Sequence, residues 1–343
     1  LGAEIKAFHD YFVSDSEEQA AAAFVIEEVK EGLRQGQFRG TLEVFGSRRT
    51  GLGLATSDID LRLMPLTISP DTQLHKAPRK DVRRQLGGSL VYLFDVFRSD
   101  SKEFMLVTFR HSRYPLISMQ HRESGLDIQI VLSNDTRLQR DYIQRQLSEI
   151  PDLKPLYVLF KMTLDIRGLN NVFRGGLGSY PLFNMLVAPL RLKIPENELG
   201  ISNFEKNLEV ILDFWGNLST QHTAVSVEPP MLLKKYTKET DVGYCHAQWK
   251  KNRANEVKEP YMLCLQDPVD PYNDLGRKAF GIKHILYTLI MLRAELKMAK
   301  QNPETKSHLA AWVGSVPDYL GARREKVRAY ARSKISASQA SNI

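Results

Sequence analysis

Apolar residues recur at helical spacing in two runs near the start of the chain, Ala3 to Phe12 and Glu17 to Leu33. Ser14 and Ser16 stand before the second run and can cap a helix, while Gly36 follows it and can end one. The pattern therefore predicts two helices in the N-terminal segment.

The pattern then changes to the alternation of β-strands. Leu42 to Ser47 begins with apolar residues, ten turn-forming residues follow from Arg48 to Ser57, and Asp58 to Leu63 alternates charged with apolar side chains. Successive side chains of a strand point to opposite faces, so the last segment predicts a strand with one apolar and one charged face. Asp58 and Asp60 lie on the charged face.

Two carboxylates on one face of a strand form a candidate site for a divalent metal. Mg²⁺ prefers hard oxygen ligands and uses a few carboxylates together with substrate phosphates. Gly46 lets the backbone approach a ligand closely, and Ser47 with its neighbouring amides can donate hydrogen bonds to phosphate oxygens. For Asp58 and Asp60 alone a surface turn is the simpler interpretation, but the upstream Gly-Ser favours a metal site.

A third carboxylate lies in a second alternating segment, Gly125 to Leu132. The alternation puts Asp127 and Gln129 on one face and aliphatic residues on the other. A carboxylate on a mostly buried strand is costly without a partner and becomes favourable beside a bound cation. Taken by itself, Asp127 is interpreted equally well as an acceptor for backbone amides at the end of a sheet.

The remaining pattern predicts a loop, further strands and helices. A stretch rich in basic residues, Leu66 to Gln85, is a loop that enters a helix, although a solvated helix face would explain the same charges. Leu90 to Phe97 and Phe104 to Phe109 are strands or the edge of a helix. Leu153 to Leu164 and Leu182 to Leu192 have the spacing of helices.

The composition is that of an ordinary globular protein, with 43% hydrophobic and 25% charged residues among 343. The length allows two domains, and no apolar run approaches the roughly 18 residues that span a bilayer, so no membrane partner is expected. The N-terminus is unlike a signal peptide, so we expect a cytoplasmic or nuclear protein with Cys245 and Cys264 as free thiols and no zinc. An excess of 47 Lys and Arg over 40 Asp and Glu, a net charge of +7, is compatible with a nucleic-acid partner.

The order of the motifs resembles a known superfamily. Gly46-Ser47, Asp58-Ile59-Asp60 and Asp127 resemble the motif of the DNA polymerase β-like nucleotidyltransferases, in which three carboxylates hold two metal ions. Later segments are similar to the non-canonical poly(A) polymerases and terminal uridylyltransferases, above all to the branch with the nuclear exosome-linked poly(A) polymerases. These segments are Lys154 to Lys161, Arg167 to Phe173, Gly175 to Tyr180 and Asp267 to Arg277. The resemblance covers roughly residues 1 to 300.

The resemblance implies an α+β fold of two domains with the active site in the cleft between them. A palm-like nucleotidyltransferase domain with a mixed sheet and helices is expected over residues 38–145. A mostly helical central domain is expected over residues 1–37 and 146–330. The basic, Ser-rich residues 331–343 are expected to form a mobile tail.

The resemblance also implies nucleotide contacts outside the carboxylates. Lys161, on a predicted helix, supplies an ammonium for the triphosphate, and Ser179, near a helix N-terminus, contacts phosphate. Tyr180 stacks under the base, a kind of contact that contributes about 1 to 3 kcal/mol. Without the resemblance, Lys161 would be interpreted as a surface lysine and Tyr180 as a core residue.

The segment Asp267 to Arg277 is similar to the nucleotide-recognition motif of the family. The residues that the resemblance places at or beside the base edge are Asn273, Gly276 and Arg277. As a proline-bounded loop, the segment could equally serve only to cap a helix predicted from Leu275 to Lys300. Lys278 stands where adenylating relatives usually have a small hydroxylic residue, and a cationic donor there suits acceptor-rich cytosine or adenine better than uracil.

Two other departures from the family pattern affect the nucleotide contacts. Asp165 stands one turn after Lys161, where uridylyltransferase relatives often have a second basic residue, so the triphosphate charge falls to the metals, Lys161 and Arg167. The ribose-contacting Asn of the family is missing from its usual place, and Asn134 is the candidate instead.

The predicted activity is template-independent transfer of NMPs from an NTP to an RNA 3′-hydroxyl, with release of pyrophosphate. Two Mg²⁺ ions, with Mn²⁺ as an alternative, would be held by Asp58, Asp60 and Asp127. The expected base choice is cytosine-leaning or relaxed, as in the fungal enzymes that append CUCU tags to mRNA, or adenine. Alternatives are a nucleotidyltransferase that acts on a small molecule or protein, and an inactive RNA-binding scaffold.

RNA would bind to basic surfaces, since no RNA-binding module is recognisable in the sequence. These surfaces are Lys76 to Arg84, Lys250 to Arg253 and the C-terminal stretch Gly321 to Ile343. We expect weak, salt-sensitive RNA binding, a monomeric enzyme and a helper protein that supplies the substrate.

Overall fold

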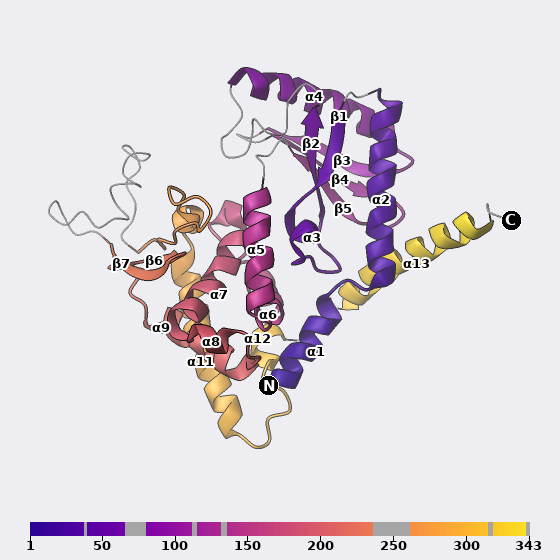
Figure 1. Cartoon of the computed structure of the whole chain (residues 1–343). Coiled ribbons are helices and arrows are strands. Elements are labelled where there is room, and N and C mark those ends of the chain that lie inside the picture. The colour runs from indigo at the N-terminus through magenta and orange to yellow at the C-terminus, as the bar shows by residue number, and fades with distance from the viewer. Residues whose placement is uncertain are drawn as a thin grey trace. The chain divides into compact units, whose positions relative to one another are not determined.

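The computed structural model describes residues 1–37, 40–65, 80–111, 115–131, 136–235, 261–314 and 318–340. The chain forms two units (Figure 1). The helical unit comprises Leu1–Tyr11 and Tyr142–Ser315, and the sheet unit comprises Phe12–Asp141 and Val316–Ile343. None of the described helices is long and apolar enough to cross a membrane.

The sheet unit is built on a mixed five-stranded sheet, as expected. Its strands are β1 (Gly40–Val44), β2 (Ile59–Pro65), β3 (Phe104–Arg110), β4 (Leu116–His121) and β5 (Asp127–Val131), in the order β1-β2-β5-β4-β3. The β2 and β5 strands run parallel, and the other neighbouring pairs are antiparallel. The central position of β2 and β5 brings the two segments with acidic residues side by side.

Three long helices bury one face of this sheet. They are α2 (Ser16–Gln35), α4 (Lys80–Ser99) and α13 (Asp318–Ala340), and α13 crosses α2 and packs against it (Figure 1). The core between them includes Ile59 and Ile128 from the sheet, Val29 from α2, Phe97 from α4 and Val327 from α13. Burial of this apolar face leaves the alternate, polar side chains of β2 and β5 for the opposite face.

The helical unit consists of helices and a small β-hairpin. Its helices are α1 (Gly2–Phe12), α6 (Leu153–Ile166), α7 (Ser179–Lys193), α8 (Glu196–Leu199), α9 (Phe204–Asn217), α11 (Ile282–Gln301) and α12 (Ala310–Val313), with 3-10 turns η2 (Val172–Arg174) and η3 (Leu275–Lys278). The hairpin pairs β6 (Thr223–Val227) with β7 (Pro230–Lys234), and α5 (Arg137–Glu149) starts in the sheet unit and ends in this one.

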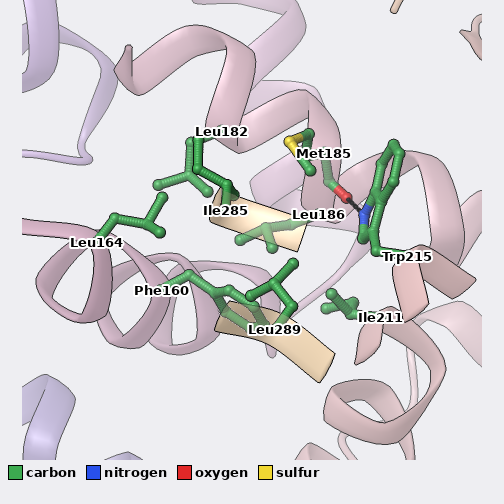
Figure 2. Close-up of a pocket in the computed structure, with 9 residues that line it drawn as sticks. All are labelled: Phe160, Leu164, Leu182, Met185, Leu186, Ile211, Trp215, Ile285 and Leu289. Atoms are coloured by element: carbon green, nitrogen blue, oxygen red, sulfur yellow. Dashed lines mark hydrogen bonds between the residues drawn. The ribbon is translucent and has the colours of Figure 1, made fainter. Parts of the chain in front are cut away.

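The interior of the helical unit is apolar where α6, α7, α9 and α11 meet. Figure 2 shows a small gap among nine side chains there, including Phe160, Leu186 and Leu289. The Trp215 indole donates a hydrogen bond to the Met185 carbonyl oxygen at 2.7 Å, which satisfies the polar atom of that ring. A gap with such a lining belongs to the core, since a nucleotide site needs several polar groups.

The local predictions are partly confirmed. The helices α1, α2, α6 and α7 and the strands β1, β2 and β5 lie where they were predicted. The turn predicted from Arg48 to Ser57 is wrong at its start, because α3 (Gly46–Thr50) includes Arg48 to Thr50. Leu90 to Phe97 belongs to helix α4, and the N-cap of α2 is Asp15, whose carboxylate accepts from the amide of Glu18.

Two larger boundaries differ from the prediction. The helix predicted from Leu275 to Lys300 is divided, because η3 ends at Lys278 and α11 begins at Ile282. Residues 12–37 and 316–330 lie with the sheet, since α2 and α13 cover its apolar face. The residues predicted to form a mobile tail continue α13 as far as Ala340.

Candidate active site

The aspartates of the sheet unit occupy one face of two neighbouring strands. Asp58 directly precedes β2, Asp60 lies in β2 and Asp127 is the first residue of β5. The parallel register pairs Ile59 with Ile128 and Asp60 with Gln129, and both isoleucines are fully buried. The aspartates therefore point away from the core, and the register continued by one residue puts Asp58 beside Asp127.

Asp60 lies in a crowded and partly desolvated position. Burial and the neighbouring Asp58 carboxylate raise the pKa of Asp60 to about 6, although the Arg48 guanidinium lowers it. Gly46 lies against the carboxylate: a Cβ there would be 2.1 Å from Asp60 Oδ2, and Gly46 has a positive φ of 66°. Only glycine fits this position without displacing Asp60.

Hydrogen bonds fix the other two carboxylates. Gln129 donates to Asp58 Oδ2 at 2.7 Å, and Gln120 donates to Asp127 Oδ1 at 2.9 Å. Arg323, from α13, pairs with Asp127 Oδ2 at 2.7 Å. Both members of this pair are about a third or more exposed, so the attraction between them is weak and a stronger cation can replace Arg323.

The donor set fits a hard divalent cation. Carboxylate oxygens are the ligands that Mg²⁺ prefers, and a cation would offset the repulsion that raises the pKa of Asp60. The three carboxylates are not gathered to metal-binding distance. Among the described residues, the group whose ligand atoms all lie within 4.8 Å is Glu28, Glu103 and His121. That group lies on the side of the sheet that the helices cover, where the ring of His121 also contacts Tyr330 of α13.

The predicted phosphate contacts of the helical unit lie together. Lys161 on α6 donates a hydrogen bond to the hydroxyl of Ser179, the first residue of α7, at 3.0 Å. The N-cap of α7 is Gly178, which makes no side-chain cap bond, so amides of the first turn are not capped by that residue. An ammonium, a hydroxyl and a helix N-terminus form a suitable environment for phosphate.

The predicted base-binding residues are joined by a residue that the sequence reasoning missed. The Tyr180 hydroxyl donates to Asp267 Oδ1 at 2.9 Å, and the Asn273 amide donates to Asp267 Oδ2 at 3.0 Å. Asp267 is 3% exposed, and burial raises its pKa. Burial and the charge of Asp267 also raise the pKa of Tyr180, so its hydroxyl remains a donor. Position in the recognition segment was the signal that could have singled out Asp267.

In the recognition segment, Gly276 is buried and closely packed, whereas the two residues that follow it are exposed. A Cβ on Gly276 would be 2.2 Å from the Leu263 carbonyl oxygen, so a glycine is required by close packing. Asp274 caps the turn by accepting from the amides of Gly276 and Leu265. Arg277 and Lys278 are exposed, as a role in ligand recognition would require.

Three other predicted contacts have different outcomes. Arg167 donates to the main-chain carbonyls of Thr163, Ala311 and Trp312, so its guanidinium is held by the fold and the predicted phosphate contact is unsupported. Ser47 lies in α3 next to Gly46, as the motif requires. Asn134 lies outside the described residues, as do Lys76 and Lys250 to Arg253 of the predicted basic surfaces.

Arg48 is the further residue of this site that the sequence reasoning missed. Its guanidinium donates to the Ser57 carbonyl at 2.8 Å and lies near both Asp58 and Asp60. It is a cation held beside two carboxylates, and its charge lowers the pKa of Asp60, against the raising effect of burial and of Asp58. No sequence signal beyond its place after Gly46-Ser47 marked it.

In three comparisons with known proteins, the chain is similar to RNA polymerases that make poly(A) or poly(U). Residues 1–143 match the family model described as poly(A) RNA polymerase, mitochondrial-like, central palm domain. The chain is 26% identical over 290 residues to poly(A) RNA polymerase cid14 of Schizosaccharomyces pombe. This match covers 83% of the chain but 39% of the relative, so the chain spans about two fifths of that protein's length.

Solved structures share the fold at lower identity. The polymerase core of TRAMP, an RNA surveillance complex, superposes with a TM-score of 0.68 and 22% identity, covering 95% of this chain and 94% of that one. The Cid1 poly(U) polymerase superposes with a TM-score of 0.64 and 15% identity, covering 92% and 98%. These likenesses establish the fold of the chain.

Proposed function

We propose that this chain, which belongs to the non-canonical poly(A) polymerase family, is a template-independent nucleotidyltransferase that extends the 3′ end of RNA. The observation that carries the proposal is the arrangement of Asp58, Asp60 and Asp127 on one face of two parallel strands. In the reaction, the 3′-hydroxyl oxygen of RNA forms a bond to the α-phosphorus of an NTP, and the bond to the leaving pyrophosphate breaks.

Asp58, Asp60 and Asp127 are the residues that would hold two Mg²⁺ ions, with Mn²⁺ as an alternative. When bound, such ions lower the pKa of the attacking hydroxyl and neutralise the leaving pyrophosphate. The Asp60 carboxylate has a pKa of about 6 and is therefore ionised at neutral pH, when it can act as a ligand. Gln129 orients Asp58, and the absence of a side chain at Gly46 keeps space for Asp60.

The helical unit supplies the proposed contacts to the nucleotide. The Lys161 ammonium and the Ser179 hydroxyl can both donate to phosphate oxygens. The hydrogen bond from Lys161 to Ser179 keeps the two groups close together. The hydrogen bond from Tyr180 to Asp267 fixes the orientation of a ring that can stack on a base. Asn273 shares Asp267 with Tyr180, which couples the stacking residue to the recognition segment.

Base choice is the finer part of the proposal. Arg277 and Lys278 are exposed donors next to the tightly packed Gly276. Two cationic donors suit the acceptors of cytosine or adenine better than the N3 donor of uracil. We therefore propose relaxed or cytosine-leaning incorporation, of the kind that makes CUCU tags, with adenine as the other choice.

The test is an assay of RNA 3′-end labelling with each NTP supplied separately, in Mg²⁺ and again with a chelator. We expect extension of the RNA, release of pyrophosphate, loss of both with the chelator, and turnover of CTP. Use of ATP alone would end the cytosine hypothesis but leave the enzyme class intact. Transfer to a small molecule or protein and not to RNA would overturn the proposed function.

A protein partner is proposed for RNA delivery. The structural neighbour from TRAMP is the polymerase core of a larger complex, and no RNA-binding module is recognisable in this sequence. A helper that brings the RNA would compensate for weak, salt-sensitive binding by the basic surfaces.

A further inference from the structure

Asp58, Asp60 and Asp127 lie on one face of β2 and β5, which we call the aspartate face. A small pocket lined by arginines lies next to this face in the sheet unit. Gly46, which packs against the Asp60 carboxylate, is also part of the pocket wall. The pocket encloses about 260 Å³, including the part that is open to solvent. Four arginines are among the described residues that line it, and we call it the arginine pocket: Arg49 from α3, Arg62 from β2, and Arg137 and Arg140 from α5.

The described lining of the arginine pocket is rich in basic residues. Among the described residues that line it, Glu43 is acidic, and it pairs with Arg62 across β1 and β2. Arg62 is 5% exposed, and a cation so buried is costly unless anions lie near it. Arg140 pairs with Asp141 outside the lining, at 3.0 Å. Arginine is the most frequent residue type among the described residues of the lining, and its guanidinium groups can donate to an anion in the pocket.

Arginine favours one class of anion. Its planar fork donates two parallel hydrogen bonds to phosphate or carboxylate, and it is less strongly hydrated than lysine. The hydroxyl groups of Thr50 and Thr136 also line the pocket and can donate to a third oxygen. Several guanidinium groups with hydroxyl donors around one small space match the oxygens of a phosphate group.

The position of the pocket indicates which phosphate it would take. Arg62 follows Asp60 by two residues on β2, so both side chains are on the same face, about 6.6 Å apart along the strand. The phosphates of the NTP have proposed partners in the metal ions, Lys161 and Ser179. The other phosphates that must lie near the aspartates belong to the RNA strand whose 3′-hydroxyl reacts there.

We propose that the arginine pocket binds a backbone phosphate of the RNA strand close to its 3′ end. The inference rests on the proposed function, since it takes RNA as the substrate of the aspartate face. It gives the sheet unit a defined RNA contact, distinct from the basic segments predicted from sequence. One phosphate held there positions the 3′-terminal nucleotide without reading its base.

The test compares two double variants with equal changes of charge. Arg49→Gln with Arg137→Gln removes two cations from the pocket and leaves the buried Arg62 in place. The matched control, Arg98→Gln with Arg110→Gln, removes two exposed cations from α4 and from β3, the edge strand opposite β1. Binding of single-stranded RNA is measured at several salt concentrations, and KM is measured for the NTP.

We expect the pocket variant to bind RNA about tenfold more weakly than wild type, because it cannot make the same hydrogen bonds to a charged phosphate. The slope of log affinity against log salt should fall by about 0.7 for each phosphate that the variant no longer neutralises, with the NTP KM unchanged. Equal losses of affinity in the control variant would overturn the proposal. An increased NTP KM with unchanged RNA affinity would assign the pocket to the triphosphate and would also overturn it.

A chemical change in the RNA locates the phosphate. Neutral methylphosphonate linkages are placed one at a time at the first, second and third positions from the 3′ end. At one position the neutral linkage should weaken binding of the RNA to wild type and to the control variant. It should not weaken binding to the pocket variant, because the neutral linkage and the loss of the two arginines remove the same interaction. Additive effects at all three positions would contradict a specific pocket. The readout is binding, so absence of tailing by wild type would refute the proposed function while leaving this result interpretable.

Discussion

At the scale of single residues, the fold keeps the Asp58 and Asp60 carboxylates of the aspartate face close together although they repel each other. Asp60 is desolvated beside Asp58, and this is the cause of its raised pKa. Gly46 permits the arrangement because any side chain there would collide with the Asp60 carboxylate. A group of like charges kept together by the fold is typical of a functional site, since folding alone gains nothing from it.

The unfavourable charge predicts the effect of Asp60→Asn on metal-free protein. The pKa of Asp60 is about 6 in the folded state and near 3.8 in the unfolded state, so the folded protein binds the proton more tightly. Ionisation of Asp60 therefore lowers stability as pH rises from about 4 to 6, and the full cost is present at neutral pH. Asp60→Asn should raise the free energy of unfolding by on the order of 1 to 3 kcal/mol at neutral pH, and by less near pH 4.

Urea denaturation with a chelator at the two pH values measures this difference. The nearby change Ser57→Ala cannot serve as the control, because the Ser57 hydroxyl accepts a hydrogen bond from the Leu54 amide and its loss would itself change the stability. Asp213→Asn, an exposed change in α9 of the helical unit, controls for the loss of one negative charge. A lower stability of Asp60→Asn at neutral pH would show that Asp60 stabilises the fold and is not poised for a ligand.

The sequence was sufficient to predict this face but not its surroundings. Alternation along Asp58 to Leu63 and along Gly125 to Leu132 determined which side chains share a face, because a strand has a period of two. The contacts of Asp127 with Arg323 and of Tyr180 with Asp267 join residues far apart in the chain. A local pattern carries no information about such pairs.

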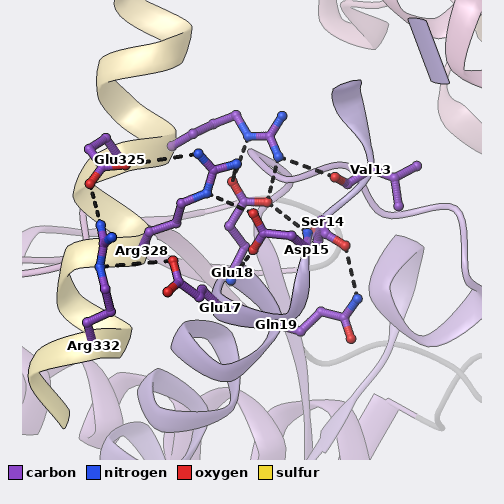
Figure 3. A network of polar contacts seen from close by, with 10 residues as sticks. Val13, Ser14, Asp15, Glu17, Glu18, Gln19, Glu325, Arg328 and Arg332 are labelled. Carbon is purple, nitrogen blue, oxygen red and sulfur yellow. Dashed lines mark hydrogen bonds and ion pairs between the residues drawn. The ribbon is translucent and has the colours of Figure 1, made fainter. Parts of the chain in front are cut away.

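At the scale of elements, α13 is held against α2 by a polar network as well as by the core. Glu18 of α2 accepts from Arg324 of α13 at 2.6 and 2.8 Å, and both side chains are almost fully buried. Arg328 pairs with Asp15 at 2.8 Å, and Arg332 extends the network at the surface (Figure 3). Asp15 and Glu18 also form the capping box of α2, so the same carboxylates begin one helix and bind another.

Arg324→Met should destabilise the sheet unit by about 3 to 5 kcal/mol, because it leaves the buried Glu18 carboxylate without its main partner. Adding Glu18→Gln should recover part of the loss, since the buried charge is then removed. Arg332→Met is the control: its side chain is 50% exposed, and loss of an exposed ion pair costs about 1 kcal/mol or less. Urea denaturation measures all three, and equal effects of Arg324→Met and Arg332→Met would contradict a buried, structural pair.

The network explains why the domain boundaries were not predicted. The C-terminal stretch from Gly321 is basic, and the composition of its Ser-rich end, residues 331–343, indicates a mobile tail when considered alone. Its arginines, however, meet acidic residues of α2 more than 300 positions earlier in the chain. Its apolar residues Val327, Tyr330 and Ala331 join the sheet core. Within the predicted tail itself, Ala331 joins this core and Lys334 pairs with Glu28 of α2 at 2.7 Å, so the described residues 331–340 continue α13.

At the scale of the whole molecule, each unit carries one part of the proposed chemistry. The sheet unit holds the three aspartates and the arginine pocket. The helical unit holds Lys161, Ser179 and the contacts of Tyr180 and Asn273 with Asp267. The expectation of an active site between two domains stays a prediction. The local motifs were enough to single out the three aspartates, Lys161, Ser179, Tyr180 and Asn273 as candidates, but neither the arginine pocket nor the contacts of Asp267 follow from a local motif.

The most direct test of the account is RNA tailing by Asp58→Ala and Asp60→Ala, with wild type assayed in parallel. Both variants should fold, as judged by circular dichroism and thermal melting, because neither carboxylate belongs to the buried core. The account predicts that each abolishes extension of the RNA 3′ end with every NTP, since each removes a ligand of the proposed metal ions. Retained tailing by either folded variant would contradict the assignment of the aspartate face as the catalytic centre.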